Sequence, residues 1–120
     1  MAQYQHLPIY KTTYELLVSI THATANFSKA YKYSLGDKLR AEVVELVVFI
    51  FKANSSRTDR AAHASLFLER LQVVELMLRL SKDLRLLTVK QFAEIVSLSD
   101  SLGRQAQGWV KSSALLAASK

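Results

Sequence analysis

The stretch Tyr33-Ser-Leu-Gly-Asp-Lys-Leu-Arg-Ala-Glu-Val-Val-Glu-Leu-Val-Val-Phe-Ile-Phe51 decides the fold of this chain. Ser34 predicts the start of a helix, because its hydroxyl can accept a backbone N–H that has no partner within the helix, and Asp37 follows at the capping-box distance. Apolar residues then recur at helical spacing in two stripes. The first stripe comprises Leu35, Leu39, Val43, Leu46 and Ile50, and the second comprises Val44, Val48 and Phe51. One stripe can face a core, so we predict that the second contacts other copies of the chain.

Length and composition predict one all-α domain over residues 1–120. A chain of 120 residues that is 50% hydrophobic can build one core and is too short for two ordinary domains. Three Gly and one Pro leave few turn residues for a β-rich fold, and good helix formers fill the rest. The absence of cysteine excludes disulfides and thiolate catalysis, and it fits a reducing compartment.

The sequence predicts a soluble, cytoplasmic protein that makes no membrane contact. The longest apolar run, from 46 to 51, is far shorter than the about 20 residues that span a bilayer. The N-terminal residues lack the basic start and apolar run of a signal peptide.

Three further helices are expected around the central one. Pro8 fits a first helical turn, Thr58 or Asp59 can cap the third helix, and Thr88 with Gln91 forms a capping box before the fourth. The predicted helices cover about 8–27, 34–53, 59–85 and 89–112, with a flexible tail over 113–120. Short connections make an antiparallel up-down-up-down four-helix bundle the simplest topology.

The same periodicity predicts which side chains are buried. Beside the central stripe, the buried faces comprise Ile9, Leu16, Ile20, Ala23 and Phe27 in the first helix, Leu66, Phe67, Leu71, Val74 and Leu78 in the third, and Phe92, Ile95, Val96, Leu98 and Leu102 in the fourth.

No residue pattern indicates catalysis, a metal or another cofactor. A di-metal bundle would need Glu-x-x-His pairs, and none occurs, while His6, His22 and His63 are isolated. Glu42 and Glu45 share a helix face, but Lys38 stands four residues before Glu42 and predicts an ordinary surface pair. A Gly-rich phosphate loop and a nucleophilic triad are also missing. We therefore expect a protein that is not an enzyme.

The basic residues are better arranged than the acidic ones. Sixteen Lys and Arg against ten Asp and Glu give a formal charge of +6, which favours a polyanionic partner such as RNA or DNA. The bundle topology would bring the end of the third helix near the start of the central one, and phosphate contacts there are the predicted use. The candidate nucleic-acid-binding residues are Lys29, Lys32, Lys38, Arg40, Arg79, Lys82, Arg85, Arg104 and Lys111. A basic surface that is merely solvated is the alternative.

Residues 29–33 combine two lysines with two tyrosines, and they are expected to connect the first helix to the central one. Such tyrosines can stack on nucleic-acid bases. More often they seal the corner between two helices, and we expect that role for Tyr31 and Tyr33.

Several short motifs, taken in order, resemble a known family. They are Leu7-Pro-Ile-Tyr-Lys11, the run from 33 to 40, Lys82-Asp-Leu-Arg-Leu-Leu87, Lys90-Gln-Phe-Ala93, and Gly103-Arg104 with Gly108-Trp-Val-Lys111. Over about residues 7–112 the chain resembles the four-helix-bundle family that contains the accessory variability determinant (Avd) proteins of diversity-generating retroelements. The same family includes proteins encoded in intervening sequences of large-subunit ribosomal RNA genes.

The resemblance implies properties beyond those read from the residues. It implies a homopentameric barrel with a positively charged surface that binds nucleic acid, associates with the reverse transcriptase of the retroelement and supports mutagenic retrohoming. The expected function is therefore that of a non-catalytic accessory protein. A ribosomal-RNA-associated bundle without a reverse transcriptase partner remains an alternative, as does a structural protein-interaction module whose charge is incidental.

Overall fold

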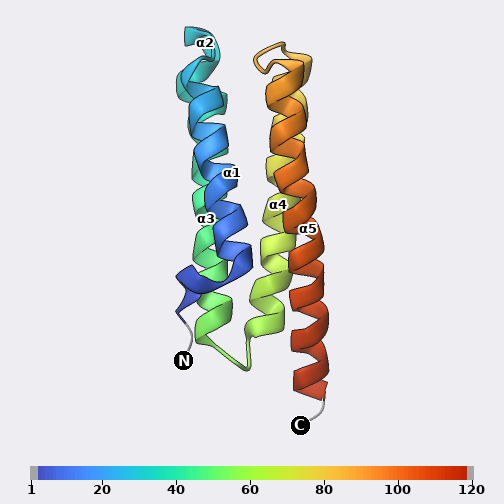
Figure 1. Ribbon diagram of the computed structural model, residues 1–120. Coiled ribbons are helices and arrows are strands. Elements are labelled where there is room, and N and C mark those ends of the chain that lie inside the picture. Colours follow the sequence, from blue (N-terminus) through green and yellow to red (C-terminus); the bar gives the residue numbers. More distant parts are fainter. Residues whose placement is uncertain (1–2, 119–120) are drawn as a thin grey trace.

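The computed structural model describes residues 3–118, which form a bundle of four long helices (Figure 1). The chain alternates in direction through α1 (Pro8–Ala25), α3 (Asp37–Ser55), α4 (Arg60–Asp83) and α5 (Val89–Ala118). Shorter elements are the 3-10 turn η1 (Tyr4–His6), the helical turn α2 (Lys29–Tyr31) and the π-helical turn η2 (Lys32–Gly36). The prediction of an all-α, antiparallel bundle is confirmed for these residues.

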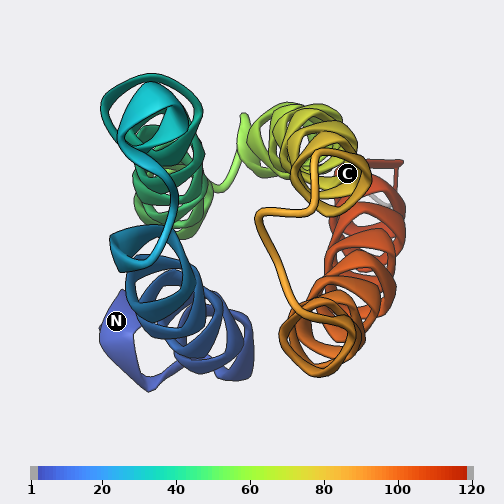
Figure 2. The ribbon, with the colours of Figure 1, turned by 90° about the horizontal axis from the view of Figure 1, so that it is seen from above.

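The four long helices occupy the corners of a square. Helix α1 packs against α3 and α5, and α4 packs against the same two helices, so α1 and α4 lie on opposite corners (Figure 2). The molecule is elongated, with extents of 52 × 20 × 19 Å. No helix within residues 3–118 combines the length and the apolar character that crossing a membrane requires.

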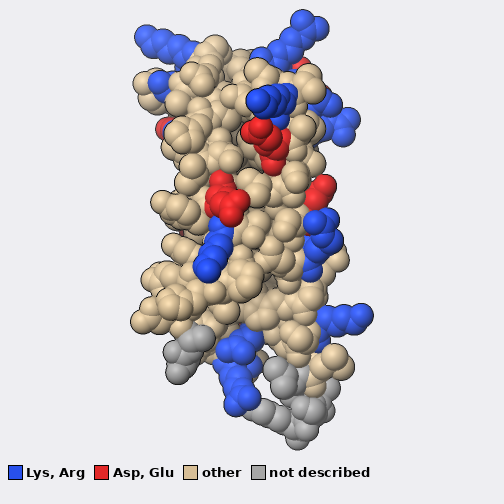
Figure 3. All heavy atoms as spheres, viewed as in Figure 1, with Lys and Arg blue, Asp and Glu red and all other residues tan. Residues whose placement is uncertain are grey.

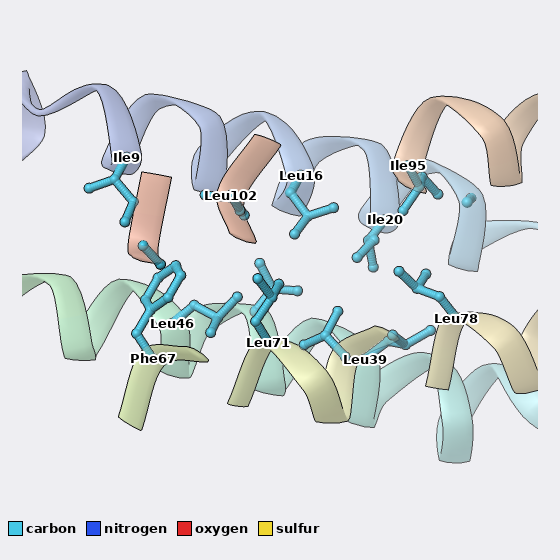
Figure 4. Close-up of a cluster of buried hydrophobic side chains, with 14 of the residues drawn as sticks. Ile9, Leu16, Ile20, Leu39, Leu46, Phe67, Leu71, Leu78, Ile95 and Leu102 are labelled. Carbon is cyan, nitrogen blue, oxygen red and sulfur yellow. The ribbon is translucent and has the colours of Figure 1, made fainter. Parts of the chain in front are cut away.

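The core lies along the centre of the square. Leucine and isoleucine side chains from all four helices point toward one another, with Phe67 near one end (Figure 4). Leu16, Leu46 and Leu102 are fully buried there. The predicted buried faces are largely confirmed, but Leu66 is 41% exposed because its neighbour Phe67 occupies the core position. Phe92, Val96 and Leu98 are only half-buried at the edge of the core.

The predicted start of the central helix is wrong. The backbone is helical from Lys29 onward, because the N–H groups of Tyr31 and Lys32 both donate to the carbonyl oxygen of Ser28 at 2.9 Å. Ser34 makes no capping bond, and its hydroxyl instead donates to the Ala30 carbonyl oxygen at 3.3 Å. Residues 29–33 therefore extend the central helix toward its N-terminus instead of forming an irregular connection.

The other helix ends follow the sequence signals more closely. Helix α1 starts at Pro8 as expected, and Asp59 stands at the start of α4, although its side chain does not cap the helix. Helix α5 continues to Ala118, so the expected end at 112 is wrong and residues 113–118 are helical. The remainder of the predicted tail, 119–120, lies outside the described residues.

The capping box of α5 provides a test of the fold. The Gln91 backbone N–H donates to Thr88 Oγ1 at 3.0 Å, and the Thr88 N–H donates to Gln91 Oε1 at 3.0 Å. We expect Thr88→Ala to lower the free energy of unfolding by about 1 kcal/mol, because it removes the hydroxyl that accepts a helix N–H. Urea denaturation followed by circular dichroism measures the change. Thr88→Ser keeps the hydroxyl and should retain most of the stability, so equal losses in the two variants would contradict the capping role.

Candidate nucleic-acid interface and assembly surfaces

The bundle brings two basic segments to one end of the molecule. We call residues 29–40 and 79–90 the basic end, since α2, η2 and the start of α3 lie there beside the turn between α4 and α5. These segments hold eight Lys and Arg and only two acids, Asp37 and Asp83. The rest of the sequence holds eight basic and eight acidic residues, so the basic end carries the whole formal net charge of +6. Figure 3 shows Lys and Arg side chains projecting from this upper end, with most of the visible acidic groups below them.

Two of the eight cations are neutralised within the bundle. Arg40 pairs with Asp37 and donates from Nη1 to Thr24 Oγ1 at 2.6 Å, so its half-buried guanidinium ties α3 to α1. Arg79 Nε lies 3.7 Å from Asp83 Oδ2. Because its charge is matched and its donors are engaged, Arg40 contributes mainly to packing.

The other six cations have no carboxylate within ion-pair distance among residues 3–118, and all but half-buried Lys32 are exposed. They are Lys29, Lys32, Lys38, Lys82, Arg85 and Lys90. Lys82 Nζ lies 5.0 Å from the centroid of the Phe92 ring, a contact that orients the ammonium group without neutralising it. An anion that approaches this end therefore meets several uncompensated positive charges.

Lys90 is a member of this group that the sequence analysis missed. It stands in the first turn of α5, directly after the connection from α4. The capping box at Thr88 and Gln91 fixes the start of that helix, so the signal for its position was present in the sequence.

Arg85 adopts a backbone conformation that favours glycine, with φ at 62°. It follows the last turn of α4, where the Leu86 N–H donates to the Ser81 carbonyl oxygen and the Arg85 N–H donates to that of Lys82, both at 2.9 Å. This pair of bonds is a Schellman motif, which closes the helix around a residue in the left-handed region. An L side chain in that region costs about 1 kcal/mol or more.

Arg104 and Lys111 do not belong to the basic end. They lie 14 and 21 residues beyond Lys90 along α5, or about 21 and 32 Å at 1.5 Å per residue. Arg104 lines a hollow of about 320 Å³ between α4 and α5, and two acidic residues, Glu75 and Asp100, line the same hollow. The structure thus brings seven of the nine predicted binding residues together and separates these two.

The two tyrosines of the basic end are exposed, contrary to the expectation that they seal a helix corner. Tyr33 is 69% exposed and Tyr31 is 37% exposed. Phe27 is the buried aromatic residue at the end of α1. The interpretation of Tyr33 as a packing residue is therefore wrong.

The paired carboxylates of α3 also differ from the prediction. Arg70 of α4, rather than Lys38, is the partner of Glu42, with Nη1 3.4 Å from Oε1. Within residues 3–118 no group of three His, Asp or Glu side chains is placed to hold a metal ion.

The predicted interface residues of α3 are accessible at the surface. Val44 is 47% exposed, Phe51 is 51% exposed and Val48 is half-buried. The Tyr4 ring contacts Phe51 edge-on at 5.4 Å and Tyr10 at 5.5 Å, and Tyr10 stacks on Tyr14 of α1. We call the surface formed by Tyr10, Tyr14, Val18, Val44, Val48 and Phe51 the α1–α3 apolar face.

A second apolar surface, which the sequence analysis missed, runs along α4. Its residues recur every three, four or seven positions and are 37 to 69% exposed. This α4 apolar stripe comprises Leu66, Val73, Leu76, Leu80 and Leu84. Because α1 and α4 lie on opposite corners of the bundle, the two apolar surfaces lie on different sides of the molecule.

Fold and charge together define a class, a small basic protein built as a four-helix bundle over residues 3–118. Comparison with known families is more specific. The model of the bAvd-like family matches residues 7–113, so the chain belongs to the bAvd-like family, and the resemblance to Avd proteins is confirmed. No curated protein and no solved structure matches the chain.

The left-handed backbone at Arg85 leads to a prediction. Arg85→Gly should raise the free energy of unfolding by about 1 kcal/mol, because glycine adopts this conformation without a steric cost. Arg85→Ala removes the same charge but keeps a Cβ, so it should show no such gain. Equal stabilities of the two variants in urea denaturation would mean that the backbone at residue 85 is not strained.

Proposed function

We propose that this protein is a non-catalytic accessory protein of a diversity-generating retroelement, which binds nucleic acid through the basic end and associates with a reverse transcriptase in the cytoplasm. The observation that carries the proposal is the concentration of the whole net charge in residues 29–40 and 79–90. Membership of the bAvd-like family supports the retroelement role over the ribosomal-RNA alternative.

The chemistry of the basic end fits phosphate groups better than base edges. Lysine ammonium groups act as compact point charges, and five of the six uncompensated cations are lysines. Neutralising phosphates with such groups releases condensed counterions, which gives strong binding without sequence recognition. Arg85 supports the same reading, because a charged residue at a position that favours glycine gives up stability at this end.

The two apolar surfaces support assembly into a ring. A two-fold dimer uses one self-complementary surface, whereas a closed ring of more than two copies uses two unlike surfaces that meet head to tail. The α1–α3 apolar face and the α4 apolar stripe provide such a pair on different sides of one protomer. We propose that they meet between neighbouring protomers, and family membership supports five copies.

Ring assembly would multiply the charge available to a polyanion. Cyclic symmetry relates all protomers equivalently, so every basic end would lie at the same height around the axis. A long nucleic acid could then contact several basic ends, and each contact after the first would be intramolecular. The reverse transcriptase would bind the same assembly and gain access to the nucleic acid that it holds.

Charge reversal at the basic end tests the binding role. We expect Lys82→Glu with Arg85→Glu to weaken binding to RNA and DNA and to reduce the slope of log K against log salt by about 1.4 to 1.8, because two phosphate contacts are lost. Fluorescence anisotropy across a salt series measures both quantities.

A matched control exists at the opposite end of the bundle. Lys52 and Arg57 are exposed, and Lys52 Nζ lies 5.6 Å from the Phe49 ring as Lys82 lies over Phe92. Lys52→Glu with Arg57→Glu changes the net charge by the same amount and should weaken binding much less. Equal losses in the two double variants would show that total charge matters and that the basic end is not the binding site.

Assembly is tested on the α1–α3 apolar face. We expect Val48→Asp to dissociate the oligomer, because burying an unpaired carboxylate in an apolar contact costs several kcal/mol. Light scattering reports the mass. Val89→Asp introduces the same side chain at a residue that is 82% exposed in the first turn of α5, where an acid is favourable, and should leave the mass unchanged. A Val48→Asp protein of unchanged mass would remove this face from the interface.

A further inference from the structure

We propose that Tyr33 is a stacking platform for an unpaired base, so that the basic end binds single-stranded nucleic acid in preference to duplex. This inference rests on the proposed nucleic-acid binding and specifies the class of ligand. It starts from the exposure of Tyr33, a residue that is 69% exposed and has two lysines nearby in the sequence.

Tyr33 lies in an unusual stretch of backbone. Residues 32–36 form a turn of π-helix, which has more residues per turn than the α-helix that follows. Within this turn Gly36 is buried and Leu35 is half-buried, while Tyr33 is exposed to solvent. Turns of π-helix are rare in proteins, and those that occur are often found at functional sites, so this turn also points to a functional role for the segment.

The surroundings of the ring suit a nucleotide. Lys32 Nζ lies 5.8 Å from the centroid of the Tyr33 ring, and Lys29 precedes Tyr33 by four residues on the same helical side. A base stacked on the ring would therefore have cations available for the phosphates on either side of it. Single-strand binding proteins combine aromatic rings with basic grooves in this manner.

Other exposed tyrosines lack this combination. Tyr14 is 54% exposed, but its ring stacks on Tyr10 at 6.3 Å and belongs to the α1–α3 apolar face. Tyr31 lies at the basic end but is only 37% exposed. Tyr33 is thus the tyrosine of residues 3–118 that joins high exposure with uncompensated charge.

Stacking on Tyr33 would discriminate between single-stranded and duplex nucleic acid. In a duplex each base is already covered by its neighbours, so an aromatic side chain meets mainly sugar and phosphate. An unpaired base offers its π-face to the ring. The lysines of the basic end would serve both ligands, whereas Tyr33 would add affinity only for the single strand.

The test compares the affinities of matched variants for single-stranded and duplex nucleic acid. Anisotropy gives the affinities of a 20-nucleotide oligo(dT), a 20-nucleotide oligo(U) and a 20-base-pair DNA duplex at one salt concentration. We expect Tyr33→Leu to weaken single-strand binding roughly tenfold while duplex binding stays within about twofold. Tyr33→Phe keeps the ring and should bind the single strands like the unmodified protein. Circular dichroism verifies the fold of each variant.

A second readout does not depend on loss of binding. In a Trp109→Phe background, Tyr33→Trp places the protein's only tryptophan at the proposed platform, and stacking of thymine on it should quench the fluorescence. Unquenched fluorescence at saturating oligo(dT) would overturn the inference, as would equal losses for single strand and duplex in Tyr33→Leu. Failure of the unmodified protein to bind any of the three probes would instead overturn the proposed function.

Discussion

Each helix of this bundle can turn only one side toward the shared core, and the properties of the surface follow from this constraint. Fully buried leucines such as Leu16, Leu46 and Leu102 supply the stabilising burial, about 1.5 to 3 kcal/mol for each such side chain. Val44 on α3 and Leu76 on α4 lie on other sides of their helices and cannot reach that core. These exposed apolar side chains are surplus to the core of one protomer, and they form the surface that the proposed assembly would cover.

Charge is distributed as unevenly as apolar area. Crowding six uncompensated cations into one end costs repulsion, and the helix termini offset only part of it. Lys82 and Arg85 stand at the C-terminus of α4, where the helix dipole favours positive charge, but Lys90 stands at the N-terminus of α5, where it does not. The local arrangement is thus poorly explained by the stability of the isolated protomer, and a polyanion that relieves the repulsion explains it better.

Features that depend on the periodicity of the sequence were predicted. Features for which two nearby residues were both suitable, such as the helix start or a core position, were missed. The core stripe of α3 from Leu39 to Ile50 and the capping box at Thr88 were predicted correctly, because spacing alone determines them. Ser34 has a side chain suited to capping a helix. The helix nevertheless begins earlier, because the Ser28 carbonyl oxygen accepts the N–H groups of Tyr31 and Lys32. Leu66 and Phe67 both fit an apolar face, yet adjacent residues point about 100° apart on a helix of 3.6 residues per turn, and only one of them could enter the core.

The basic end could be predicted from the bundle topology, but the exposure of Tyr33 could not. The two features would also contribute to binding in different ways. Charge attracts any nucleic acid and falls with salt, whereas a stacked ring acts only on an unpaired base and depends little on screening. Stacking on one tyrosine side chain adds only a modest free energy of binding. In a ring of protomers the same tyrosine would recur around one rim, so a strand that passes several basic ends would meet several platforms at fixed spacing. Selectivity for single strands would then grow with the number of protomers engaged, so the proposed assembly through the apolar surfaces would strengthen the preference for single strands.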